Sequence, residues 1–225
     1  MKTFKEELIN TWKIFQENWV SFFIIFVINI ILMVLCCIPI GLSIVRTGLS
    51  ANINKEQLLS LMKDVQFLIP LFISANLAFL AYIFSLIASF TIASGEKKWK
   101  QAIKKAFSLF WRVYFMVLFG LFLACIGFCL LIIPGVLILF YLSFILPVMI
   151  NENTGIIETM KRSRFLIKNN WKAIAWRFFL FALVTCLFNA IIEALHLGTL
   201  DTLVSLIFLP IFYTVLYKEV NTIQS

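Results

Sequence analysis

The stretch that decides the fold is VYFMVLFGLFLACIGFCLLIIPGVLILFYLSFILPVMIN, residues 113–151, which runs for 39 positions without a charged side chain. About 20 apolar residues are enough for one helix to cross a bilayer, so this stretch is long enough for two passes. Its middle contains Ile133, Pro134 and Gly135. Proline lacks the amide that an interior helical turn uses, and glycine relaxes the backbone. The stretch therefore predicts a tight hairpin of two membrane-spanning helices that reverses at residues 133–135.

The composition of the whole chain agrees with this interpretation. Of its 225 residues 62% are hydrophobic and 13% charged, the mean hydropathy is +1.01, and there are 25 Phe and 6 Trp. Soluble domains have roughly 45–50% apolar and about 25% charged residues, so a water-soluble domain is excluded.

Six apolar segments are predicted to span the membrane, which gives an all-α, polytopic fold of three hairpins. They are expected at residues 20–40, 67–93, 113–132, 136–150, 173–195 and 200–217. The fourth is short, so it either begins before Pro134 or runs nearly upright. Ala78, Ala81, Ser85 and Ala88 form a small-residue ridge on the second, where a neighbouring helix can approach closely. Residues 41–66 are expected to form a polar loop with a short amphipathic helix at 57–62.

The connector after the second span is basic and amphipathic. Trp99, Ala102, Ile103, Ala106, Phe107 and Phe110 recur at helical spacing, and Lys98, Lys100, Lys104 and Lys105 take the other side. Such a helix is expected along an anionic lipid surface. The connector 151–171 is basic too. The candidate lipid-headgroup contacts are Lys98, Lys104, Lys105, Lys161, Arg162 and Arg164. Arg177, near the start of the fifth span, is expected to reach the interface by snorkelling.

The distribution of Lys and Arg predicts the orientation. The N-terminal arm, the connectors 96–112 and 151–177, and the tail hold 16 of the 19 basic residues, and the two tight loops near 134 and 197 hold none. Basic loops stay in the cytoplasm, so both termini are expected there, in a cell membrane. The arm has acidic residues and no cleavage pattern, so it is not interpreted as a signal peptide. Orientation and anionic headgroups explain the net charge of +8 better than a nucleic-acid partner does.

The three cytoplasmic segments share a spacing that suggests a threefold repeat within one integral membrane domain. Phe4, Leu8, Thr11, Phe15 and Trp19 step by 4, 3, 4 and 4 residues, and so do Trp99, Ile103, Ala106, Phe110 and Tyr114, and Ile156, Met160, Ser163, Ile167 and Trp171. Each stripe has a small residue at its centre, where another helix could come close, and an aromatic ring at its end. The predicted repeats are 1–94, 96–150 and 154–217. The alternative is that so apolar a chain fits a helical template by chance.

Several short motifs in the second half of the chain resemble a known bacterial pattern. They are Ile133-Pro134-Gly135, Pro147, Asn151-Glu152, Lys161-Arg162-Ser163 and Asn170-Trp171. In order and spacing, residues 125–215 are similar to the membrane domain attached to some glycerophosphodiester phosphodiesterases and to the related YciC-like inner-membrane proteins. The resemblance implies a six-helix integral membrane protein. The 225 residues contain no soluble phosphodiesterase domain, so it implies none of that catalytic activity.

A few polar residues fall at hydrocarbon depth. Asn29, Asn76 and Asn189 lie one in each of three spans, either to link helices by hydrogen bonds, which we favour, or to line a polar path. Glu193 and His196 are spaced i, i+3, as in a ligand pair or proton relay, although a hydrogen-bonded pair at the interface is the preferred interpretation.

Other candidate chemistry is sparse. Glu152 is expected to cap the helix at 154–170 or to pair with Lys161, Arg162 or Arg164. The five Cys all fall in apolar runs, which favours packing; a metal held by Cys125 and Cys129 is the less favoured alternative. No metalloprotease, phosphate-cradle or nucleophilic-serine motif occurs, so neither a catalytic centre nor a cofactor is predicted.

Three functions are compatible with these patterns. The favoured one is a non-enzymatic membrane protein that acts through packing, lipid contact or a membrane-protein partner. The alternative is a small transporter, permease component or channel, whose polar route would use Asn76, Asn189, Glu193 and His196. The least favoured is a lipid-modifying enzyme.

Overall fold

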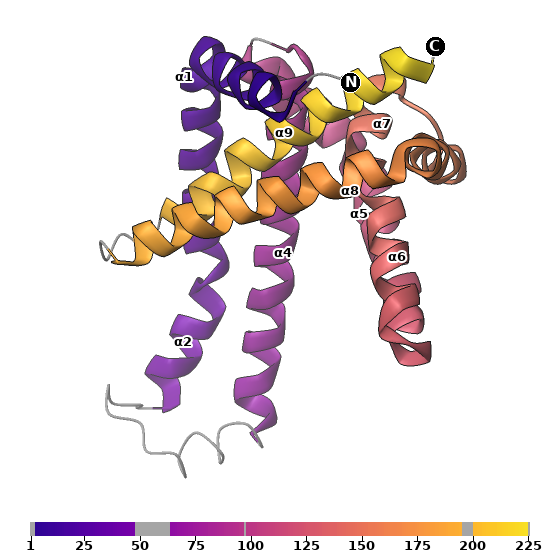
Figure 1. Ribbon diagram of the computed structural model, residues 1–225. Helices are drawn as coiled ribbons and strands as arrows, with labels where there is room; N and C mark the ends of the chain where they lie inside the picture. Colours follow the sequence, from indigo (N-terminus) through magenta and orange to yellow (C-terminus); the bar gives the residue numbers. More distant parts are fainter. Residues whose placement is uncertain (1–2, 48–63, 97, 195–199, 225) are drawn as a thin grey trace.

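The computed structural model describes residues 3–47, 64–96, 98–194 and 200–224, and every regular element in these ranges is an α-helix (Figure 1). The helices are α1 (Phe4–Cys36), α2 (Ile38–Thr47), α4 (Val65–Ser94), α5 (Trp99–Leu130), α6 (Ile132–Leu142), α7 (Ile145–Glu152), α8 (Ile156–Ala194) and α9 (Leu200–Gln224). Within the described ranges six helical stretches are long and apolar enough to cross a membrane, with α1 and α2 sharing the first and α6 and α7 the fourth. An all-α, multi-pass chain is thereby confirmed.

The central hairpin reverses at Leu131, two residues before the predicted break. Leu131 is extended, with φ −166° and ψ 152°, and is the single residue between α5 and α6. Pro134 lies in the first turn of α6, where the missing amide costs little. Gly135 has no positive φ. The fourth segment therefore begins before Pro134, as one of the two expectations had it, and α7 extends it to Glu152.

The two glycines of this hairpin allow α5 and α6 to come into backbone contact. A Cβ atom on Gly127 would lie 2.8 Å from the Cα atom of Gly135. A Cβ atom on Gly135 would lie 2.6 Å from the ring of Phe128. Gly135 is thus required for close packing between the helices rather than for freedom of the turn.

The first hairpin packs through the predicted ridge of small residues. Ala81, Ser85 and Ala88 are buried on α4, which contacts α1. The Asn29 amide of α1 donates a hydrogen bond to the Ser85 hydroxyl at 3.0 Å, so this asparagine links two helices. The predicted loop is shorter than expected, because α2 continues to Thr47. The helix expected at 57–62 lies outside the described residues.

Two helices are broken at an asparagine that precedes a tryptophan. Asn18 (φ −125°, ψ 16°) interrupts α1 and Asn170 (φ −129°, ψ 23°) interrupts α8, each just before the last residue of its stripe. The corresponding residues of α5 lie inside one continuous helix of 32 residues. The basic first turns of α5 therefore continue without interruption into its apolar part. This differs from the prediction of a separate helix that lies along a lipid surface. The small residues at the stripe centres, Thr11, Ala106 and Ser163, are all buried.

Helices α4, α7 and α9 contact one another, and α1, α5 and α8 pack around them. The core includes Phe90, Met116, Met149 and Ile211, and a second buried cluster joins Phe144, Leu166 and Phe212. In Figure 1 the lower part of α1, with α2, α4 and the α5–α6 hairpin, points in one direction, whereas α8 and α9 run obliquely across them. The third pair of helices is thus inclined to the other two.

Replacing Gly127 by alanine should destabilise the protein by about 1–3 kcal/mol, because the new methyl group would collide with backbone that cannot move aside. The measurement is the midpoint of thermal unfolding in detergent, followed by loss of the monodisperse peak in size-exclusion chromatography. Gly41→Ala is the control, since nothing lies within 4 Å of that position. Equal midpoints for both variants would contradict the close packing of α5 on α6.

Candidate functional site

A buried arginine lies between two carboxylates from opposite ends of the chain. Nη1 of Arg177, on α8, is 2.8 Å from Oε1 of Glu7, on α1. Its Nη2 is 3.5 Å from Oε1 of Glu219, on α9. The three side chains are only 8%, 0% and 9% exposed. The expectation that Arg177 snorkels is therefore wrong: its forked guanidinium turns inward and joins three helices.

Glu7 and Glu219 were not recognised as site residues from the sequence, although the repeat contained a signal for one of them. In the predicted alignment Glu7 corresponds to Ala102 and Thr159, and all three positions are 0% exposed. A carboxylate at such a position requires a cation. Nothing in the local pattern around Glu219 marks it in this way.

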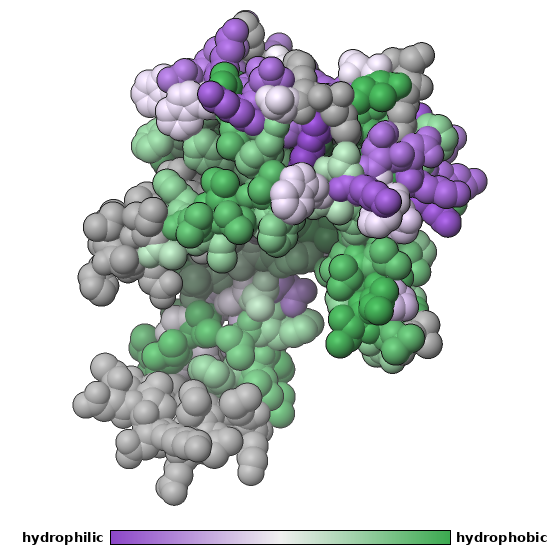
Figure 2. All heavy atoms as spheres, viewed as in Figure 1, coloured by the Kyte–Doolittle hydropathy of each residue, from purple (hydrophilic) through white to green (hydrophobic). Residues whose placement is uncertain are grey.

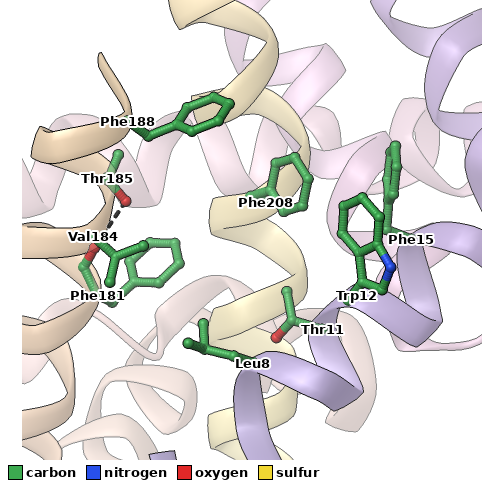
Figure 3. A pocket seen from close by; sticks show the side chains of 9 residues that line it. All are labelled: Leu8, Thr11, Trp12, Phe15, Phe181, Val184, Thr185, Phe188 and Phe208. Carbon is green, nitrogen blue, oxygen red and sulfur yellow. Dashed lines mark hydrogen bonds between the residues drawn. The ribbon is translucent and has the colours of Figure 1, made fainter. Parts of the chain in front are cut away.

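An apolar cavity of about 510 Å³ lies between α1, α8 and α9 (Figure 3). Its walls are Leu8, Thr11, Trp12, Phe15, Phe181, Val184, Thr185, Phe188 and Phe208. Trp12 stacks on Phe208 with ring centroids 6.3 Å apart. The hydroxyls of Thr11 and Thr185 donate to carbonyls of their own helices, at 2.8 and 2.9 Å. The lining thus suits a hydrocarbon chain rather than a polar molecule.

A second cavity, of about 490 Å³, combines an apolar floor with two cations. It lies between the α5–α6 hairpin and the first half of α8, and is lined by Leu123, Pro134, Leu137, Ile138, Tyr141, Leu142, Met160, Lys161 and Arg164. The Ser163 hydroxyl donates to the Tyr141 carbonyl at 2.6 Å and fixes α8 against α6. The Arg164 guanidinium carbon is 5.9 Å from the centre of the Tyr141 ring. We call this cavity the α6–α8 groove.

Glu152 pairs with Arg162, one of its three predicted partners. Oε1 of Glu152 is 3.4 Å from Nε of Arg162 and accepts a hydrogen bond from the Tyr217 hydroxyl at 2.8 Å. Arg162 also donates to Oδ1 of Asn221 at 2.7 Å. Arg162 therefore helps to hold α7, α8 and α9 together, and its contact with lipid stays a prediction.

The other candidate headgroup residues are distributed along α5 and α8. Lys98, Lys104, Lys161 and Arg164 are exposed, and Lys105 is partly buried. Figure 2 shows hydrophilic residues gathered over the upper part of the molecule, with largely hydrophobic surface below them. This division is the one expected at the boundary between headgroups and hydrocarbon.

The intramembrane amides lie in three separate places. Asn29 bonds to Ser85, and Asn76 donates to the carbonyl of Phe72 in its own helix at 2.8 Å. Asn189 lines a third cavity, of about 570 Å³, between α6, α8 and α9.

The predicted pair of Glu193 and His196 cannot be located, since the Glu193 side chain and the whole of His196 lie outside the described residues. Cys125 and Cys129 are free and exposed, and the described residues contain no group of three metal-ligating side chains.

Comparison of the chain with protein-family models, with curated proteins and with solved structures gives no match. The class is defined by the helices and their hydropathy: this is an α-helical protein whose described residues contain six candidate membrane spans.

Replacing Arg177 by methionine should cost about 3–5 kcal/mol of stability, because two buried carboxylates would lose their shared cation. Glu7→Gln should cost less, since Arg177 would keep Glu219. Thermal unfolding in detergent measures both. Lys172→Met, an exposed residue of the same helix, is the control. If Arg177→Met unfolded at the same temperature as Lys172→Met, the buried cluster would not hold α1, α8 and α9 together.

Proposed function

We propose that this chain is a non-enzymatic, multi-pass protein of the cytoplasmic membrane that binds anionic phospholipid through the basic segments on its cytoplasmic side. Its three helical hairpins cross the bilayer, each is preceded by a cytoplasmic helical segment, and both termini are cytoplasmic. Membrane lipid is the partner, with a further membrane protein as a second candidate partner. The resemblance to YciC-like membrane domains supports the multi-pass membrane location.

One observation supports lipid contact above the alternatives: exposed cations are followed, along the same helix, by exposed large apolar side chains. Lys98, at the N-terminal cap of α5, and Lys104, in its second turn, precede Phe115, Phe119 and Phe122, which are 57%, 49% and 62% exposed. Large apolar side chains at such exposure need a lipid environment. The cations are then at the height where phosphate groups lie.

The transport alternative has weaker support. A polar route requires side chains that face one path. Asn29 instead bonds to Ser85 on α4, Asn76 bonds within α4, and Asn189 lies beside α6. Flux through liposomes that is lost in Asn189→Leu would favour transport over lipid contact.

Orientation is tested by labelling single cysteines, placed in a chain without its five native ones, with a membrane-impermeant maleimide. Lys104→Cys should react only after the cells are permeabilised, because its loop is expected in the cytoplasm. Ser50→Cys, in the predicted outer loop, should react in intact cells and serves as the control. Reaction of Lys104→Cys from outside would invert the proposed topology.

Reversing four exposed charges, with Lys98, Lys104, Lys161 and Arg164 each changed to Glu, should deplete the anionic phospholipid that co-purifies with the protein. Each cation near an anionic surface contributes about 1 kcal/mol, so the loss should exceed about tenfold. Mass spectrometry of extracted lipid measures the ratio of phosphatidylglycerol to phosphatidylethanolamine. An unchanged ratio in a correctly folded variant would reject the lipid-binding role.

A further inference from the structure

We infer that the α6–α8 groove is a defined site for one anionic phospholipid, with the phosphate on Lys161 and Arg164 and an acyl chain over Leu123 and Leu137. This inference rests on the proposed function and narrows it from a basic surface to one place. Of the six candidate headgroup residues, it assigns phosphate binding to Lys161 and Arg164.

The two cations at the groove are available for a phosphate. Lys161 and Arg164 are three residues apart on α8, so they share a face of the helix. Neither forms an ion pair within the described part of the chain, because Glu152 is occupied by Arg162 and Tyr217. Glu158, one turn before Lys161, is exposed and is the acidic side chain nearest along the helix. Arg164 rests above the Tyr141 ring, an arrangement that leaves guanidinium N–H groups for an oxyanion.

The floor of the groove is suited to hydrocarbon. All its lining residues from α5 and α6 are apolar or aromatic, and Leu137 is 47% exposed. The volume of about 490 Å³ is within the usual range for small-ligand sites, roughly 300–1,000 Å³. Cations at one end and an apolar floor at the other match the two ends of a phospholipid.

The groove is held in shape by contacts behind it. The bond from Ser163 to the Tyr141 carbonyl fixes α8, and the approach of Gly127 to Gly135 fixes the α5–α6 hairpin. A preformed site loses less entropy on binding than a mobile one.

The other cavities lack this combination. No cation lines the cavity between α1, α8 and α9, nor the one beside Asn189. A further cavity between α1 and α9 has Lys13 and Lys218, but Glu17 lines it as well, and the Lys218 ammonium donates to the Ser94 carbonyl. Among these four cavities, the α6–α8 groove is the one that joins cations without a lining carboxylate to an apolar floor.

The test is a titration of the purified, delipidated protein with phosphatidylglycerol, counting bound lipids by native mass spectrometry. The double variant Lys161→Gln/Arg164→Gln should bind the first lipid about tenfold more weakly, because two phosphate contacts are lost. Leu137→Trp, which fills the groove and keeps both cations, should weaken it similarly. The matched control, Lys168→Gln/Lys172→Gln, removes two exposed cations of α8 that do not line the groove, and should bind like the unaltered protein. Thermal unfolding checks that each variant is folded.

The outcomes separate the site from the broader function. Equal weakening by the two double variants would overturn the site and leave the proposed lipid-binding role standing. Loss in Lys161→Gln/Arg164→Gln without loss in Leu137→Trp would overturn the acyl chain's place in the groove. Equal first-lipid affinity for phosphatidylcholine and phosphatidylglycerol would overturn the selection of an anionic headgroup. If no variant weakens binding, and reversing all four charges leaves the co-purified lipid unchanged, both proposals fail.

Discussion

The guanidinium of Arg177, shared by carboxylates from the first and last helices, constrains how this chain can be arranged. Charges with little access to water must be paired, and unpairing one is costly. Because Glu7 is near the beginning of α1 and Glu219 near the end of α9, a single side chain of α8 fixes both ends of the chain. Figure 1 shows the oblique course of α8 and α9, and α9 contacts both α1 and α8, so the three groups meet where these helices pack.

Several other polar side chains of the described segments also link helices. Ser94, at the end of α4, accepts hydrogen bonds from Asn151 on its hydroxyl and from Lys218 on its carbonyl. Asn29 and Ser163 each add one such link. Between helices in lipid, where no hydrophobic force drives association, such bonds and close packing of small residues determine the arrangement. The exposed basic residues of α5 and α8 are thereby left to contact the surroundings.

The sequence predicted the elements of this fold well and their contacts less well. Segment length and hydropathy are local properties, so the six apolar stretches could be predicted, with an early start of the fourth as one of two alternatives. The partners of Arg177 could not, because they come from positions 7 and 219 and meet only once the third pair of helices is inclined to the others. The pairing of Glu152 with Arg162 could be predicted only as one of several alternatives, because a short turn separates their helices but Lys161, Arg162 and Arg164 all follow on α8. The groove could not be predicted beyond its cations, since its floor comes from two other helices.

The break at Asn170 explains why a groove forms on α8 and not on α5. The two connectors have similar basic content, but α5 runs as one helix into its apolar part, so its cations line up along a single axis. In α8 the backbone departs from helical geometry at Asn170, which lets the residues before it take a different direction from those after it. Ser163 then lies against Tyr141, and Lys161 and Arg164 come to the edge of an apolar surface that belongs to other helices.

Asn18 gives α1 the same break, but there the buried acidic residue Glu7 is engaged by Arg177. Three segments of similar pattern thus differ in the direction of their charged side chains, and on α8 the cations meet an apolar floor supplied by neighbouring helices.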